Sequence, residues 1–373
     1  DSEPVPFTVD GTQDVVVVEK HNMPQKGIIH ITKTGEVFAT VTETDGVDKD
    51  GAEVMYQPVY EIRGLEGATY EIRAAEDIYT PDGTLRAAKG DVVDTITTAG
   101  NGIASSKELY LGKYEIREIQ APFGMVLNQE SKQVELVYAG QEIDVTEVSS
   151  GFYNERQKVQ MSLEKMLEVN EVFGIGNNNE LTNVTFGLYA AEDITAADGA
   201  VIPADGLIEV VGIDADGNGV VKTDLPFGSY YLREHSTDAH YILSDEKYPV
   251  TFSYGSQEDA VITVKANDGE AIVNELIYGS VSGRKIDENG DALGGAKIGL
   301  FAPSVTEFTE ENAIVVTTSA EDGTFSFSDI PYGKWIVREI EQPEGFVLCT
   351  EQFPVVINED AQVVEVEITN EFI

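Results

Sequence analysis

The chain has 373 residues, of which 67 are acidic and 24 are basic, so its formal net charge is −43. The acidic residues are spread along the whole chain and argue against binding to nucleic acids or anionic membranes, because both would repel it. Its single cysteine provides no internal disulfide framework, and no stretch is long and apolar enough to span a bilayer. The hydrophobic content of 42% suffices for ordinary cores, and the length predicts roughly two to four domains.

Residues 1–26 come before the first regular unit and resemble the end of the last one. The run from Val5 to Asn22 follows the same pattern as the run from Phe353 to Asn370. We therefore interpret residues 1–26 as the C-terminal strands of a truncated upstream module, and we expect the chain to be a segment of a longer protein. The alternative is an extra hairpin that belongs to the first unit.

The rest of the chain contains three related units. A block that begins at Gly67 recurs from Asn183 and, more weakly, from Gly295. A second block ends each time in Arg-Glu, and each unit closes on Asn-Glu. The copies of the second block are Gly112–Glu118, Gly228–Glu234 and Gly333–Glu339. These repeats predict three modules, which we number 1 to 3, at residues 27–157, 158–277 and 278–373.

Each unit has the pattern of an all-β fold. Polar and apolar residues alternate with a period of two, and Gly, Asp, Asn and Pro interrupt them at strand-length intervals. This pattern is typical of an Ig-like β-sandwich of short strands, and no stretch predicts an amphipathic helix. The linkers at Glu155–Lys158 and Glu275–Tyr278 are short, so we expect tandem sandwiches in an elongated, stiff array.

A lysine lies on the apolar face of the first strand of each unit. Side chains in a strand alternate between its two faces, so residues two apart share a face. By this test Lys33 shares its face with Ile29 and Ile31. The corresponding residues are Lys165 with Met161 and Leu163, and Lys285 with Val281 and Gly283.

A glutamate and an asparagine of each unit also lie on an apolar face. Glu118 follows Tyr114 and Ile116 along one face, and Asn154 follows Phe152. The same test selects Glu234 and Asn274 in the second unit, and Glu339 and Asn370 in the third.

Three such polar groups in one core suggest a reaction. Burial lowers the pKa of a lysine and raises that of a glutamate, so both groups move toward their neutral forms. A neutral amine is a nucleophile, and a protonated carboxyl group can donate a hydrogen bond and relay protons. An amine held beside an amide has a very high effective concentration, so the expected product is a Lys–Asn amide with loss of ammonia. The alternative is a buried Lys–Glu ion pair with an asparagine beside it.

These trios make each unit similar to the collagen-adhesin B-type domains, also called SpaA-like or prealbumin-like, of Gram-positive surface proteins and pilins. The runs Arg117–Gly124 and Arg338–Gly345 support the resemblance, whereas the second unit departs from it after Glu234. The resemblance implies an autocatalytic isopeptide bond between first and last strands, assisted by a glutamate. The implied trios are Lys33/Glu118/Asn154, Lys165/Glu234/Asn274 and Lys285/Glu339/Asn370.

The implied function is a structural stalk or spacer on a bacterial cell surface, with anchoring parts outside this segment and with further modules of the same polypeptide as partners. The alternative is that one module binds a host matrix protein or a glycan. Module 1 is then the first candidate, because it carries an insertion at about residues 36–63. An enzyme that acts on external substrates ranks third, since the expected reaction is internal and occurs once.

Other motifs predict no cofactor and no metal. The run from Asp214 to Gly219 resembles the start of a calcium loop, but Leu225 stands where the bidentate glutamate is expected. The four histidines lack metal-ligand spacing. We interpret Cys349 as a small, half-buried residue and not as a nucleophile.

Overall fold

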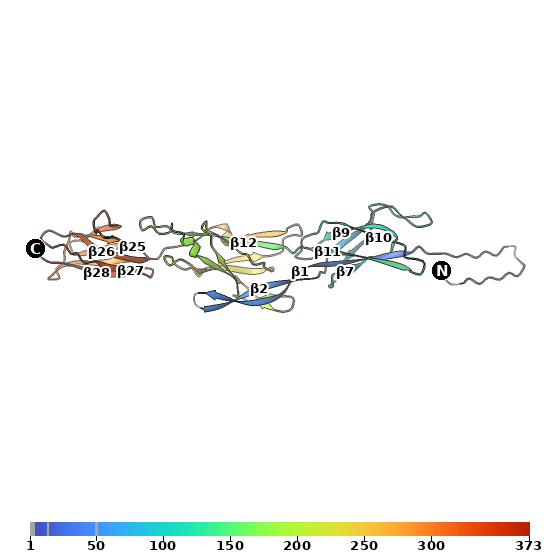
Figure 1. Ribbon diagram of the computed structural model, residues 1–373, viewed down its shortest axis with the longest axis horizontal. Helices are drawn as coiled ribbons and strands as arrows, with labels where there is room; N and C mark the ends of the chain where they lie inside the picture. The colour runs from blue at the N-terminus through green and yellow to red at the C-terminus, as the bar shows by residue number, and fades with distance from the viewer. Residues whose placement is uncertain (1–3, 13–14, 49–50) are drawn as a thin grey trace.

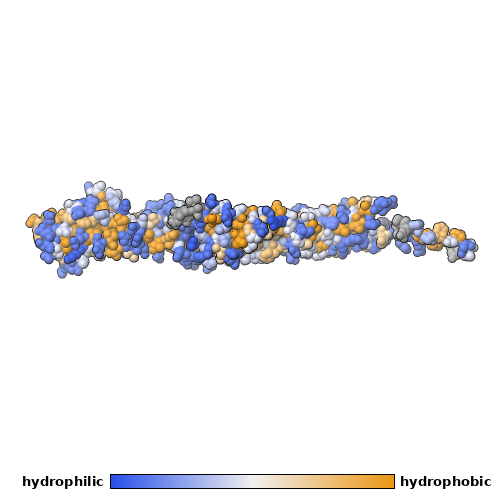
Figure 2. Space-filling view, turned by 90° about the horizontal axis from the view of Figure 1, so that it is seen from below, coloured by the Kyte–Doolittle hydropathy of each residue, from blue (hydrophilic) through white to orange (hydrophobic). Residues whose placement is uncertain are grey.

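The computed structural model describes residues 4–12, 15–48 and 51–373 of the protein. Three β-sandwiches follow one another along a rod, with the C-terminus at one end (Figure 1). The rod is slender in the perpendicular view as well (Figure 2). The prediction of an all-β fold with three modules in tandem is confirmed.

Module 1 consists of two facing sheets. In the first sheet, β1 (Lys26–Asp48) pairs in parallel with β11 (Val145–Asn154), and antiparallel with two short strands, β7 (Ile103–Ser105) and β8 (Leu109–Tyr110). The second sheet has the order β10 (Lys132–Leu136), β9 (Gly112–Gln120), β3 (Thr69–Ala74) and β6 (Val92–Thr97). A small hairpin joins β4 (Ile78–Tyr79) to β5 (Leu85–Ala87).

Module 2 repeats this plan. In its first sheet, β12 (Lys158–Leu167) lies parallel to β20 (Val261–Lys265) and β21 (Ile272–Asn274), and antiparallel to β17 (Asn218–Val220). Its second sheet has the order β16 (Leu207–Gly212), β13 (Thr185–Ala190), β18 (Gly228–Ser236) and β19 (Lys247–Phe252). The remaining elements are the hairpin β14 (Ile194–Thr195) and β15 (Val201–Ile202), and the 3-10 turns η1 (Glu180–Asn183) and η2 (Ala266–Gly269).

Module 3 has the same two sheets. In the first, β22 (Tyr278–Asp287) lies between parallel β28 (Gln362–Asn370) and antiparallel β25 (Thr324–Pro331). The second has the order β24 (Val315–Thr318), β23 (Lys297–Phe301), β26 (Gly333–Glu341) and β27 (Phe353–Ile357). In all three modules, therefore, the first strand lies parallel to the last strand within one sheet.

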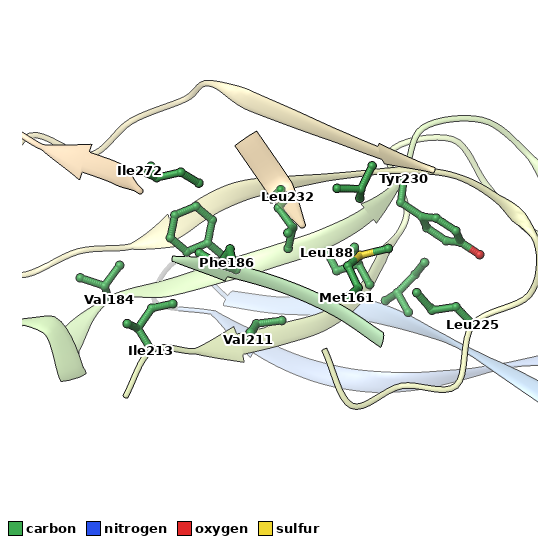
Figure 3. Close-up of a cluster of buried hydrophobic side chains, with 14 of the residues drawn as sticks. Met161, Val184, Phe186, Leu188, Val211, Ile213, Leu225, Tyr230, Leu232 and Ile272 are labelled. Carbon is green, nitrogen blue, oxygen red and sulfur yellow. The ribbon is translucent and has the colours of Figure 1, made fainter. Parts of the chain in front are cut away.

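Each sandwich has its own hydrophobic core, formed by the alternating inward residues of the two sheets. In module 2 these residues include Met161, Phe186 and Leu188, which lie between the facing sheets (Figure 3). Separate clusters fill the cores of module 1, around Tyr70, and module 3, around Phe325. Strand residues that point into these clusters are buried, as the alternation predicts.

The insertion of module 1 forms a long hairpin that leaves its own sandwich. The second half of β1 pairs antiparallel with β2 (Gly51–Gly64), and the pair extends along module 2 (Figure 1). We call residues 36–63 the arm. Strand β2 pairs with β16 at Met55 and Leu207, so one continuous sheet joins strands of both modules.

The N-terminal segment differs in character from the modules. Residues 4–12 and 15–25 form no strand, and they run outward from the first module (Figure 1). The Gln25 side chain donates a hydrogen bond to the Gly140 carbonyl and accepts one from the Ala139 amide. The interpretation of residues 1–26 as part of an upstream module stays a prediction.

Candidate cross-link sites

The fold brings each predicted trio together inside its own sandwich. The lysine comes from the first strand, the asparagine from the parallel last strand and the glutamate from the facing sheet. Each asparagine lies two positions beyond the register partner of its lysine, as with Phe152, which pairs with Lys33. All nine side chains are buried: Lys33, Glu118, Asn154, Lys165, Glu234, Asn274, Lys285, Glu339 and Asn370.

In module 1 one carboxylate oxygen contacts both reaction partners. Lys33 Nζ lies 2.9 Å from Glu118 Oε1 and donates a hydrogen bond to Asn154 Oδ1. Asn154 Nδ2 donates to the same Glu118 Oε1 at 3.1 Å. The Tyr70 hydroxyl donates a further, longer hydrogen bond to this oxygen, at 3.4 Å. The amine, the amide and the carboxyl group therefore form a closed, buried triangle.

Module 3 repeats this triangle more loosely. Lys285 Nζ donates to Asn370 Oδ1, and it lies 3.7 Å from Glu339 Oε1. Asn370 Nδ2 donates to that oxygen at 3.1 Å. The Lys285 amine also donates to the Ile368 carbonyl at 3.2 Å.

Module 2 holds the same three residues in a different arrangement. Lys165 Nζ donates to the main-chain carbonyls of Met166 and Ile272, at 2.7 and 3.1 Å. Asn274 Nδ2 donates to both oxygens of Glu234 at 2.8 Å. The Asn274 Oδ1 atom is buried without a hydrogen-bond partner in the part of the chain that the structure describes.

Burial shifts the pKa of the three lysines and of two of the glutamates in the direction that the reaction needs. Desolvation lowers the pKa of Lys33 and of Lys285, although the neighbouring glutamates oppose the shift. Desolvation lowers the pKa of Lys165 further, to about 8, and only the charge of Glu234 opposes it. Burial also raises the pKa of Glu234 and of Glu339. Amines and carboxyl groups are thereby driven toward their neutral forms.

A main-chain amide that no sequence motif indicates fixes each glutamate. The amides of Asn128, Ser244 and Cys349 donate to the second oxygen, Oε2, of their glutamates at 2.9, 2.9 and 2.7 Å. Each lies ten residues after its glutamate. The spacing is the same in all three modules, but the residues at this position are of three different types, so no sequence motif marks it. In modules 1 and 3, Oε1 is left to face the asparagine and the lysine, whereas in module 2 Asn274 binds both oxygens of Glu234.

A tight turn fixes each lysine in the same manner. The amides of Lys33, Lys165 and Lys285 donate to the carbonyls of Gly102, Gly217 and Gly323, each at 2.7 Å. These glycines have φ angles of +77°, +88° and +76°, and a Cβ atom on any of them would lie 2.3 Å from the carbonyl oxygen of the lysine. Only glycine fits there, since both the left-handed backbone and the close approach exclude a side chain.

Two of the weaker sequence signals also have a place in the fold. The Asp214 carboxylate accepts hydrogen bonds from the amides of Asp216 and Asn218, which closes the turn that contains Gly217. Cys349 is half-buried and packs against the core of module 3. Among the described residues, no helix is long and apolar enough to cross a membrane.

Comparison with known proteins places the chain in a family. The model of the SpaA prealbumin-like fold domain matches three stretches, at residues 61–149, 173–270 and 279–372. None of the curated protein sequences compared with the chain matches it.

Solved structures provide a second comparison. The Bacillus anthracis TIE protein aligns with a TM-score of 0.60 at 20% identity, over 93% of this chain and 51% of its own. The chain thus spans about half the length of that protein, and the likeness concerns the fold. The major pilin subunit BcpA of Bacillus cereus aligns at 16% identity over 94% of this chain and 100% of its own, with a TM-score of 0.38. With three matched stretches that cover most of its length, the chain belongs to the SpaA family of prealbumin-like fold domains.

Proposed function

We propose that each module locks itself with an intramolecular isopeptide bond between lysine and asparagine. The bonds join Lys33 to Asn154, Lys165 to Asn274 and Lys285 to Asn370. The observation that carries the proposal is the recurrence of one buried amine, one amide and one carboxyl group at the same place in three sandwiches. A buried ion pair could explain one such trio, but a fully desolvated lysine is costly to keep three times over.

The geometry of module 1 supports a proton path through Glu118. The neutral Lys33 amine attacks the Asn154 carbonyl carbon while Glu118 is protonated. Glu118 Oε1, 3.1 Å from Asn154 Nδ2, gives its proton to that nitrogen, which leaves as ammonia. The same oxygen, 2.9 Å from Lys33 Nζ, then takes the surplus proton of the new amide nitrogen. The glutamate ends as it began, and one amide is exchanged for another.

The cross-links suit a load-bearing stalk. A pull on the chain would enter each module at its first strand and leave at its last strand, and the bond connects the two directly. In module 1 the bond bypasses 121 residue positions. The modules would thus resist extension, heat and proteases without a disulfide bond. We infer that the chain is a spacer region of an adhesin or pilin-like protein on a Gram-positive cell surface, with neighbouring modules as its partners.

The second candidate function is ligand binding by module 1. It rests on the arm, since insertions on rigid scaffolds often carry function. Binding of the full chain to arrays of extracellular-matrix proteins and glycans would favour this alternative, provided that changes on the arm abolish it. Absence of binding to every array would favour the spacer function.

Intact-mass measurement tests the cross-links. We expect the purified chain to lack three ammonia molecules relative to its sequence, and peptide mapping to find the three lysine–asparagine pairs joined. Glu118→Ala should restore one ammonia and leave the pairs of modules 2 and 3 joined. A full, unreduced mass would refute the proposal.

A further inference from the structure

The arm of module 1 contacts module 2 through two stretches, residues 38–41 and 55–60. The amides of Ala197 and Asp198 donate to the arm carbonyls of Phe38 and Ala39, at 3.0 and 3.2 Å. On the other strand of the arm, Gln57 Nε2 donates to the Ile208 carbonyl at 2.5 Å. Both strands of the hairpin are therefore tied to the backbone of the next module.

The side chains of the arm complete apolar clusters of module 2. Phe38, Val41 and Tyr56 pack against the core of module 2. Met55 packs against a separate cluster of Tyr189, Leu207 and Tyr231, whose two tyrosine rings stack with centroids 5.1 Å apart. The three residues of this second cluster are at most 5% exposed.

Module 2 presents an apolar outer face where module 1 does not. In β3 of module 1 the outward positions hold Glu71 and Arg73, whereas the matching strand β13 of module 2 holds Gly187 and Tyr189. The burial pattern changes accordingly, from alternating in β3 to buried on both faces in β13. The sequence of module 2 is thus suited to a sheet that is covered on its outer side.

Module 3 covers the same face by its own means. Its matching outward residue, Phe301, is fully buried and packs edge-on against Phe308, with ring centroids 5.0 Å apart. Phe308 lies in the loop that follows β23. Both modules 2 and 3 thus have a sheet with an apolar outer face. Module 3 covers its sheet with its own loop, whereas the sheet of module 2 is covered by a neighbouring module.

The linker between modules 1 and 2 joins this contact. Arg156 lies between β11 and β12, and its guanidinium group stacks 3.8 Å from the ring centroid of Tyr60 on the arm. The same group pairs with Asp224 of module 2, and the Tyr60 hydroxyl donates to the Asp224 carbonyl at 3.2 Å. Arm, linker and module 2 thus meet at one buried arginine.

We propose that the arm is a lateral splint that fixes the angle between modules 1 and 2 and completes the fold of module 2. This inference rests on the stalk function proposed above and deepens it. The arm lies between Lys33 and Asn154, so a bond between those residues would carry a pull past the arm. The arm would bear no tension along the chain, would stay folded under load and would resist bending instead.

The distance distribution between two dyes on the full chain tests the splint. Thr95 in module 1 and Thr251 in module 2 are exposed strand residues. Both are changed to cysteine to carry the dyes, in a chain in which Cys349→Ser has removed the native thiol. We expect a narrow distribution in the parent chain, measured by single-molecule energy transfer. Domains of one chain move relative to each other by default, unless a large apolar interface holds them.

Two variants remove the splint in different ways. The first replaces residues 38–60 by Asn-Gly, because Val37 pairs with Glu61 and a two-residue turn can close the shortened hairpin there. The second is Val41→Asp with Met55→Asp, which keeps the arm but opposes its docking. Both should broaden the distribution by about twofold or more. The control is Ile62→Asp, at an arm position that is 66% exposed, and it should leave the distribution unchanged.

The intact mass of the same samples separates this inference from the proposed function. Retained loss of ammonia in the variants would show that the modules still fold around their trios, so that a broadened distribution reports the lost splint. A narrow distribution after removal of the arm would overturn the splint, whatever the mass. If the parent chain had its full mass, and its distance distribution were narrow and broadened when the arm was removed, the splint would be supported and the cross-links refuted.

Discussion

The sites of modules 1 and 2 contain the same three residue types but present them differently. In module 1 the lysine amine contacts both the amide oxygen and the carboxylate, with 2.9 Å between Lys33 Nζ and Glu118 Oε1. In module 2 main-chain carbonyls hold the Lys165 amine, and Glu234 accepts hydrogen bonds from Asn274 and from the Ser244 amide instead of contacting the lysine. The same reaction is therefore possible in both modules, because both contain the same trio. The lysine amine of module 2 must move farther than that of module 1 before it can react.

The largest effect should follow from removal of the acceptor. Asn154→Ala would prevent the bond proposed for module 1, which would close a span of 121 residue positions, and should cost about 5 kcal/mol of stability by the chain-entropy estimate. Asn274→Ala should cost module 2 a similar amount if its bond forms as well. Thermal unfolding of the full chain, followed by calorimetry, measures both. A large loss in module 1 with none in module 2 would mean that module 2 stays open.

The second effect concerns the rate of bond formation. Lys165 must exchange its carbonyl contacts for the amide before it can attack, so we expect the bond of module 2 to form about 10- to 100-fold more slowly than that of module 1. Peptide masses taken at intervals after cell-free synthesis of the chain would follow the three bonds separately. Equal rates would show that the contacts of the amine do not limit the reaction.

The third effect is a pH dependence that is confined to unlinked modules. In Asn274→Ala the Lys165 amine would stay free, and we expect it to keep the burial that lowers its folded-state pKa to about 8 in the parent sequence. The folded state then binds fewer protons than the unfolded state, so stability rises with pH between the folded and the unfolded pKa. Module 2 of this variant should gain about 2 kcal/mol between about pH 7 and pH 9.5.

Urea unfolding at the two pH values measures this gain. The parent chain is the control, because the proposed bond would turn Lys165 Nζ into an amide nitrogen, which does not titrate in this range. A gain of the same size in the parent would mean that Lys165 is a free amine in it.

The smallest effect should follow from the loss of the Tyr70 hydroxyl group, which donates a hydrogen bond to the glutamate of module 1 and has no counterpart in module 2. The Tyr70 hydroxyl donates to Glu118 at 3.4 Å, and the matching residue of module 2 is Phe186. Tyr70→Phe should slow the bond of module 1 by about two- to fivefold, since it removes one long hydrogen bond. The same time course of peptide masses measures it, with modules 2 and 3 as internal controls. An unchanged rate would assign Tyr70 to packing alone.

Much of the architecture follows from local pattern. The period of two predicts strands and also which face each residue occupies, so the burial of Lys33, Glu118 and Asn154 can be read from their neighbours. The repeats place the trios at matching positions in three modules. No such rule yields the amide of Asn128 or the turn at Gly102, because those contacts join a backbone group to a residue of another strand.

The sequence by itself determined the all-β fold, the three modules and the burial of the nine trio residues, because all of these depend on periodicity and repetition. The tertiary structure alone decided how each trio is arranged, and it gave the insertion at residues 36–63 its place on module 2. Both depend on contacts between segments far apart in the chain. The outward Tyr189 of module 2 signals an apolar face, but only the folded chain reveals that a neighbouring module covers it.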